Sequence, residues 1–137
     1  MIFDEVKDFY QSYQGKKCII GYSFYGREIF AFHVGDELGR QFISTYAIHG
    51  REWICARLAL RHVKKGVKGG GGWIIPLVNP DGAKISEGAK PLWKANARGV
   101  DLNCNFDADW GSGRLNISGW ASAATAQSGT IHAPVSN

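Results

Sequence analysis

The chain has 137 residues, of which 45% are hydrophobic and 20% are charged, a balance that predicts a single globular domain over 1–137. Its formal charge of +4 comes from scattered basic residues, so we expect no nucleic-acid partner. Three cysteines without a C-x-x-C pair do not suggest a disulfide framework, and no apolar leader or long apolar run is present, which predicts no membrane partner and a cytoplasmic location.

The N-terminal part predicts a helix followed by a hairpin. Apolar residues recur at three- and four-residue steps over 2–13, which is the pattern of an amphipathic helix, and Gly15 is expected to end it. Two β-rich runs follow, at 18–24 and 28–34, separated by a short Tyr-Gly-Arg segment. They predict an antiparallel hairpin.

A strand, a helix and another strand come next. The short apolar run 42–48 predicts a third strand, and apolar positions over 52–65 fit a helix packed on a sheet, which the glycines of 69–72 interrupt. Residues 73–78 predict a buried strand. Asn-Pro-Asp-Gly at 79–82 predicts a turn, because proline and glycine stand where turn geometry favours them.

Regular patterning weakens toward the C-terminus. Residues 99–103 are short and β-like, and 112–137, rich in serine, alanine, threonine and glycine, predicts a loop-like tail. The alternation of strand, helix and strand after a hairpin indicates the α/β class, with a mixed parallel and antiparallel sheet flanked by helices.

One pair of residues suggests metal chemistry. His49 ends a predicted strand and Glu52 opens the next helix, with the spacing H-x-x-E. Zinc accepts imidazole nitrogen and carboxylate oxygen together, and a catalytic zinc uses three protein ligands plus water. The spacing by itself also fits a glutamate that interacts with a helix dipole and a histidine in a turn.

Four motifs occur in order around this pair: Gly26-Arg27, His49-Gly50-Arg51-Glu52, the segment 76–82 and the segment 93–103. Together they resemble the zinc carboxypeptidases over roughly residues 17–111, and most of all the bacterial members that trim cell-wall peptides. The resemblance implies a zinc-dependent metallopeptidase of the carboxypeptidase type. Such an enzyme hydrolyses a peptide bond near a peptide terminus, and its substrates here would include peptidoglycan peptides.

The resemblance also implies roles for the metal-site residues. His49 and Glu52 would bind zinc, and Asp101 would accept the other ring N–H of His49, which fixes the tautomer of the ring. The alternative for Asp101 is the capping residue of a turn.

For the substrate, the resemblance assigns Arg98 as the residue that stabilises the oxyanion. Lys94 is its rival, because in animal members the arginine directly follows the tryptophan; either residue could instead be a surface cation. Arg51 would line the substrate groove, and Asn103 would bind the terminal carboxylate. The usual arginine beside that asparagine is replaced by Cys104, so half of the bidentate clamp is missing.

A third zinc ligand and a general base are harder to find. The family supplies them from later segments, whereas only His132 among histidines follows Asn103, and no Asp or Glu follows Asp109. His132 is one alternative for the third ligand. Cys104 is another, although a free cysteine is more often a small, half-buried filler. Family domains are about twice this length, so we expect a truncated, incomplete domain that self-associates through an uncovered sheet edge. The alternative function is a catalytically silent partial domain that binds metal weakly or serves as an interaction module.

Overall fold

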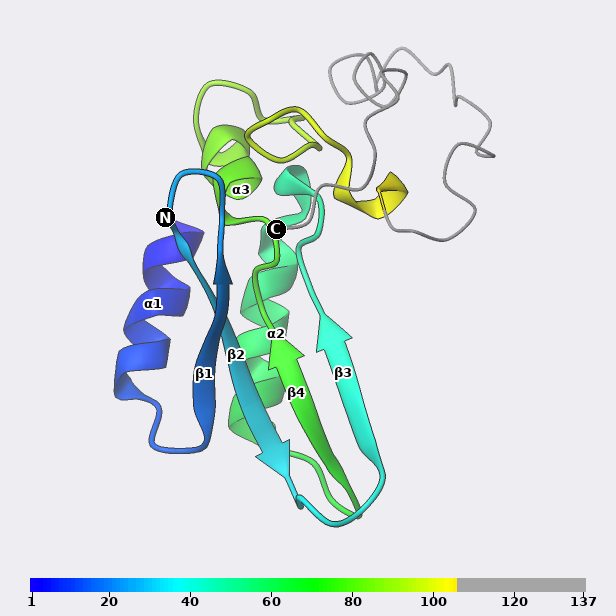
Figure 1. Cartoon of the computed structure of the whole chain (residues 1–137). Coiled ribbons are helices and arrows are strands. Elements are labelled where there is room, and N and C mark those ends of the chain that lie inside the picture. Colours follow the sequence, from blue (N-terminus) through cyan, green and yellow to red (C-terminus); the bar gives the residue numbers. More distant parts are fainter. Residues whose placement is uncertain (106–137) are drawn as a thin grey trace.

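The computed structural model describes residues 1–105, and their framework is a four-stranded sheet of order β1-β2-β4-β3 (Figure 1). β1 (Lys17–Tyr22) pairs antiparallel with β2 (Glu28–Gly35), so the predicted hairpin is confirmed. β2 pairs antiparallel with β4 (Gly71–Ile75), and β4 pairs parallel with β3 (Gln41–Thr45). The predicted mixed sheet flanked by helices is therefore confirmed.

Helix α1 (Ile2–Ser12) forms where the apolar stripe predicts it. It ends at Ser12, before Gly15, where the backbone of Tyr13 is extended. The Lys17 ammonium donates to the carbonyls of Tyr10 and Tyr13, at 2.6 and 2.5 Å. These bonds place a cation at the negative end of the helix dipole, which stabilises the helix end.

Helix α2 (Ile54–Lys65) connects β3 to β4 and lies behind the sheet in Figure 1. The predicted start at residue 52 is slightly early, because Gly50–Glu52 forms a separate 3-10 turn, η1. Gly66, with a φ of +66°, ends α2. The prediction that the glycines of 69–72 interrupt it is wrong in detail, since Gly71 and Gly72 belong to β4.

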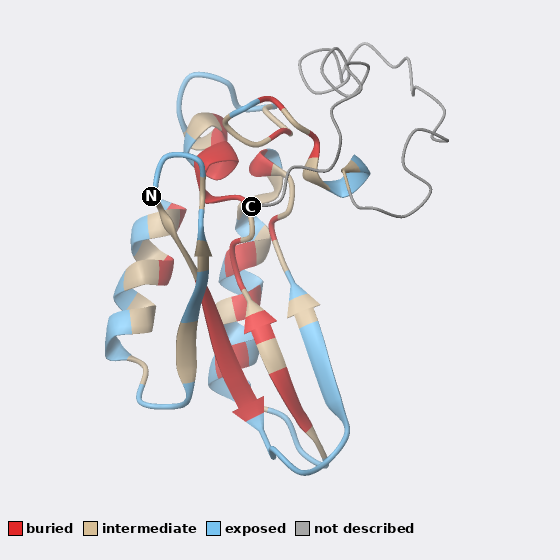
Figure 2. Ribbon diagram, in the orientation of Figure 1, coloured by how far each residue is buried: buried red, intermediate tan, exposed pale blue. Residues whose placement is uncertain are grey.

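The two faces of the sheet are covered unequally. Phe30 and Phe32 of β2 point toward α1, where Phe32 lies against the rings of Phe9 and Tyr10. Because strand side chains alternate, residues between them point the other way. We call the side with Phe30 and Phe32 the helix-covered face and the opposite side the far face. The edge strand β3 is largely exposed (Figure 2). Buried residues of the helix-covered core include Ile2, Val6, Phe30, Phe32, Val34, Ala59, Val63 and Ile74.

The predicted turn at 79–82 is wrong: Pro80–Glu87 forms helix α3. Asn79 is its N-cap, since its side chain accepts the backbone N–H of Gly82 at 2.9 Å. Proline occupies the first turn, where its missing N–H costs nothing. The residues of 79–82 are common both in turns and at helix starts. The hydrogen bond between the Asn79 side chain and the Gly82 N–H shows that here they start a helix.

Three other predicted boundaries shift. The strand predicted over 42–48 ends at Thr45, and the one over 73–78 ends at Ile75. The β-like stretch at 99–103 contains no strand; Leu102–Cys104 forms a 3-10 turn, η2, started by Asp101. The reason is local: the Asp101 carboxylate accepts the backbone N–H of Asn103, and this bond closes a turn.

No helix in the described range is long and apolar enough to cross a membrane. The predicted tail 112–137, the candidate ligand His132 and the full extent of the 1–137 domain lie outside the described residues.

Candidate metal site

The site lies where β3 and β4 end. Parallel strands present their carboxyl ends at one edge of a sheet, and the chain beyond them stays paired, with Tyr46 N–H on the Ile75 carbonyl at 2.9 Å and Asn79 N–H on the Ala47 carbonyl at 3.3 Å. Ala47 adopts a φ of +51°, a conformation that costs energy for a residue with a Cβ. This local bend precedes His49, which therefore emerges beside the loop after β4.

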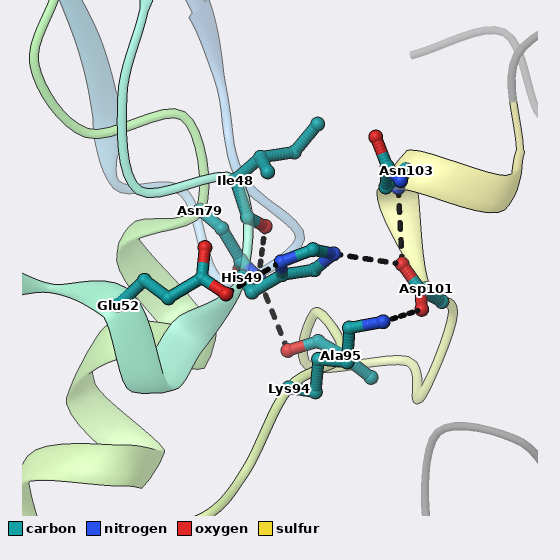
Figure 3. Close-up of polar contacts among 8 residues, drawn as sticks. All are labelled: Ile48, His49, Glu52, Asn79, Lys94, Ala95, Asp101 and Asn103. Atoms are coloured by element: carbon teal, nitrogen blue, oxygen red, sulfur yellow. Dashed lines mark hydrogen bonds and ion pairs between the residues drawn. The ribbon is translucent and has the colours of Figure 1, made fainter. Parts of the chain in front are cut away.

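His49 lies between two carboxylates (Figure 3). Its Nδ1 is 3.0 Å from Oε1 of Glu52, and its Nε2 is 3.3 Å from Oδ1 of Asp101. The second contact is a close approach of a ring nitrogen to a carboxylate oxygen and not an aligned hydrogen bond, because Nε2 is buried and makes no hydrogen bond to the described residues. The sequence predicted this neighbourhood, in which Glu52 faces one nitrogen and Asp101 the other.

Asp101 is buried and has two further partners. Its Oδ2 lies 2.8 Å from Nζ of Lys94, and its Oδ1 accepts the backbone N–H of Asn103 at 3.1 Å. Burial by itself raises the pKa of Asp101, but the hydrogen bond and charge of Lys94, with smaller effects of His49 and Asn103, bring the pKa below its usual value. The carboxylate is therefore ionised at neutral pH.

Asn79, which the sequence analysis did not single out, joins three segments around the site. Its amide donates to the carbonyls of Ile48 and Ala95, at 3.2 and 3.1 Å (Figure 3). Its oxygen caps α3. Asn79 is buried, so all of its polar atoms depend on these bonds. An asparagine immediately before a proline that opens a helix was the available signal.

Gly50 allows the same segments to approach one another. Its N–H donates to the Lys94 carbonyl at 2.9 Å. A Cβ at this position would lie 2.9 Å from the carbonyl oxygen of Trp93 and closer still to that of Gly82. Any side chain at Gly50 would therefore push apart the turn that follows His49, the start of α3 and the loop around Lys94.

The structure places Lys94, and not Arg98, beside Asp101 and His49. Arg98 is exposed and its guanidinium lies 5.8 Å from the ring centre of Phe24. The prediction that Arg98 rather than Lys94 faces the His49 cluster does not match this placement. The reason is that residues 99–103 form no strand, so the direction expected for Arg98 from strand geometry does not apply.

Arg98 instead lines a cavity of about 700 Å³ on the far face of the sheet. Apolar side chains from the sheet and the loops beyond it form much of its wall, and the polar lining residues include Asp81, Asn96, Arg98 and Asn105. The apolar lining residues include Ile20, Ile29, Ile48, Ile75, Val78 and Leu102.

The remaining predicted substrate residues are accessible. Arg51 is exposed in η1, and Asn103 is exposed in η2, two residues from Asp101. Cys104 is exposed as a residue, yet desolvation of its thiol and the nearby Asp101 carboxylate raise its pKa. A raised pKa disfavours the thiolate, which is the form that attacks or binds metal.

The residues present fit two positions of a zinc site. Ligand atoms about 2.1 Å from a tetrahedral zinc lie about 3.4 Å apart, and the 3.0 Å between His49 Nδ1 and Glu52 Oε1 is close to that spacing. Asp101 stands behind the imidazole, as carboxylates behind zinc-binding histidines do. Within residues 1–105, however, no group of three His, Cys, Asp or Glu side chains is arranged to hold a metal ion.

The fold is a mixed-sheet α/β fold, with a histidine and a glutamate side by side where the parallel strands end. Comparisons with known proteins show what it is similar to. A family model described as zinc carboxypeptidase matches residues 71–131. The zinc carboxypeptidase of Saccharothrix mutabilis subsp. capreolus is 29% identical, over 67% of this chain and 27% of that protein. Over part of its length, the chain is thus similar to zinc carboxypeptidases.

Two solved structures share the fold. Thrombin activatable fibrinolysis inhibitor matches with a TM-score of 0.71 at 23% identity, over 97% of this chain and 39% of its own. The murein-tripeptide amidase MpaA from Escherichia coli O157 matches with a TM-score of 0.53 at 24% identity, over 72% of this chain and 40% of its own. The chain spans only 27% of the length of the curated relatives that it matches.

Proposed function

We propose that this chain carries the first two zinc ligands, His49 and Glu52, of a metallopeptidase of the carboxypeptidase type, which hydrolyses a peptide bond near a peptide terminus. The observation that carries the proposal is the row Glu52, His49, Asp101, with contacts of 3.0 and 3.3 Å on the two ring nitrogens. Chance placement of a histidine and a glutamate three residues apart does not explain the buried carboxylate on the far side of the ring.

Each residue would have a distinct task. His49 and Glu52 hold the cation, and Asp101 orients the imidazole so that Nδ1 stays on the metal side. Zinc held in such a site activates water and polarises a carbonyl group. Asn103, which is exposed, is proposed to contact the terminal carboxylate of the substrate, and Arg51 would line the groove. Arg98 is proposed for the oxyanion on the resemblance of the motifs alone, since in the structure it lines the far-face cavity and not the His49 cluster.

For the substrate class we propose peptides, with cell-wall peptides first. The order of the motifs and the fold shared with a murein-tripeptide amidase support this choice. Cys104, in place of an arginine, removes one half of a bidentate carboxylate clamp, so tight binding of an ordinary C-terminal carboxylate is not expected.

The metal proposal can be tested by titrating zinc into the metal-free protein while recording amide resonances by NMR. We expect shifts centred on residues 49–52, and their loss in His49→Ala. The matched control is His62→Ala: His62 lies in α2, where Nδ1 contacts the Tyr46 hydroxyl, 2.7 Å away. Equal zinc responses in both variants would show that the metal binds elsewhere.

A second function rests on a specific observation: the described residues offer two ligands, and no third is arranged with them. Zinc held by two side chains stays mostly hydrated, so the chain by itself would bind zinc weakly and hydrolyse little, as a silent or interacting partial domain does. Tight one-to-one zinc binding together with turnover of a peptide library would exclude this function. That result would indicate that His132 or Cys104 completes the site.

The substrate roles can be separated in a full-length relative. Replacement of the arginine at the position of Arg98 by alanine is expected to lower kcat about a hundredfold, the usual loss when an oxyanion donor is removed. A larger loss from the residue at the Lys94 position would reassign that role to Lys94.

A further inference from the structure

Two hydrogen bonds hold the backbone of the loop that carries Lys94. Its own carbonyl accepts the N–H of Gly50 at 2.9 Å, and the carbonyl of the next residue, Ala95, accepts the amide of Asn79 at 3.1 Å. The loop that carries Lys94 is thereby bonded to η1 and to the cap of α3. The ammonium leaves this loop toward Asp101, with only 24% of the side chain exposed (Figure 3).

Lys94 is the permanent cation at Asp101 in the described part of the chain. His49 is the other basic partner, but an imidazole carries a full charge only when protonated, and its Nε2 is not aligned for a hydrogen bond with Asp101. The Asp101 side chain is 6% exposed, so solvent does little to stabilise the negative charge of its carboxylate. A buried carboxylate without a counter-charge is costly, and the 2.8 Å contact with Lys94 supplies that charge.

The two oxygens of Asp101 have separate partners. Oδ2 faces Lys94, while Oδ1 accepts the backbone N–H of Asn103 and lies 3.3 Å from His49 Nε2. Because both oxygens belong to one rigid carboxylate, holding Oδ2 also fixes the direction of Oδ1. Lys94 therefore affects the positions of Asn103 and His49 through Asp101, and not through a direct contact of its ammonium.

We propose that Lys94 is a positioning residue: through Asp101 it holds η2, and the backbone of Asn103 with it, against His49. Lys94 acts here from the loop before η2, at a residue to which the sequence assigned oxyanion stabilisation or a surface cation. The relevance of this placement to catalysis rests on the proposed function, but the placement itself does not require zinc.

An alternative is that the Lys94 ammonium contacts substrate directly. The geometry favours the positioning role, because the ammonium lies against a buried carboxylate, while Arg98 is exposed at the cavity wall. A lysine suits this task, since a compact point charge is enough for one carboxylate oxygen.

The test uses the metal-free chain and measures amide hydrogen exchange of Asn103 by NMR. In Lys94→Met, which keeps the length of the aliphatic stem and removes the charge, exchange of this N–H should be about tenfold faster, the effect of losing a hydrogen bond to a well-held charged group. The ring nitrogen resonances of His49 should shift at the same time. Lys94→Arg should restore both signals, and Lys84→Met, an exposed lysine of α3, should leave both unchanged.

A double-mutant cycle separates positioning from a general loss of stability. If Lys94 acts through the charge of Asp101, adding Lys94→Met to Asp101→Asn should change Asn103 exchange little further. Unchanged exchange in the single Lys94→Met variant, or additive effects in the cycle, would overturn the proposal. Should Lys94→Met not fold, Lys94→Gln against Lys94→Arg gives the same comparison. None of these readouts depends on zinc, so failure of the metal site and failure of this inference remain distinguishable.

Discussion

The helix-covered face and the far face of the same sheet are stabilised in different ways. On the first, Phe32 is 0% exposed and lies among aromatic rings of α1. On the second, Ile43 of β3 is 73% exposed. The part of this face at the ends of β3 and β4 borders the cavity of about 700 Å³. There the turn between β1 and β2 is held by an ion pair of the half-buried Arg27 with the buried Asp81. Apolar packing determines the fold on one side, and polar contacts determine the position of segments on the other.

Substitutions on the helix-covered face should therefore unfold the chain, whereas those on the far face should only rearrange it. Packed apolar side chains lose both transfer free energy and van der Waals contacts when they are shortened. Exposed apolar side chains lose little, because water already surrounds them.

The largest expected effect is that of Phe32→Ala on the helix-covered face. Its loss of about 3 to 5 kcal/mol of unfolding free energy is enough to unfold a domain of modest stability. Urea unfolding followed by circular dichroism measures it. The matched control is Ile43→Ala on the far face, expected to change the unfolding free energy by less than about 0.5 kcal/mol. Similar losses for the two variants would contradict the comparison.

The next effect concerns the ion pair at the end of the far face. Arg27→Met leaves the buried Asp81 carboxylate without its partner and should cost about 3 kcal/mol of unfolding free energy. Asp81 also accepts the Tyr25 N–H at 3.1 Å, so the turn should loosen. Adding Asp81→Asn should recover part of the loss, because no buried charge then remains. If the double variant is less stable than the single one, electrostatics is not the cause.

A smaller effect is expected on association. Within residues 1–105, β3 is an edge strand that exposes Ile43, and an edge strand of this kind favours self-association of copies of the chain. Ile43→Lys should shift the sedimentation velocity profile toward the monomer, since a charge on an edge strand opposes pairing. Leu38→Lys is the control: Leu38 is fully exposed, but it lies in the loop before β3. Equal effects of the two changes would indicate association by general surface charge.

The smallest effect lies on the outer side of the helix-covered face, where Arg57 of α2 contacts Glu5 of α1 at 2.6 Å. The hydrogen bond with Arg57 lowers the pKa of Glu5 from its usual 4.5. A carboxyl whose pKa is lower in the folded state stabilises the fold above its unfolded pKa, and this contribution disappears as the pH falls through the folded value.

Glu5→Gln should therefore lower Tm slightly at pH 6 and leave it unchanged at roughly pH 3. Thermal melts of the two proteins at both pH values measure the difference. A difference that persists in acid would mean that Glu5 acts through packing and not through its charge.

Much of the fold could be predicted because it depends on local periodicity. The apolar stripe of α1 and the alternation in β1 and β2 are visible in the sequence, and both elements lie where they were expected. α3 was missed because it is short and its first residues also favour a turn. Only the bond from Asn79 to the Gly82 N–H, formed once the chain is folded, distinguishes the two outcomes.

In the site, the sequence placed His49, Glu52 and Asp101 together, because the order of the motifs carries that information. It did not reveal the contact of Lys94 with Asp101 or the bridging bonds of Asn79. Both depend on how the loop after α3 folds back onto η1, which no short-range pattern encodes. The zinc, catalytic and substrate roles stay predictions.

The crowding at Gly50 has a consequence for natural variation in this chain. Every base change that alters the meaning of a glycine codon introduces a side chain or a stop. At Gly50 even the methyl group of alanine would overlap the Gly82 carbonyl. A missense change there should thus disrupt the arrangement of His49, Asn79 and Lys94 although it alters none of them, so a screen for inactive alleles should recover this codon alongside those of the candidate ligands.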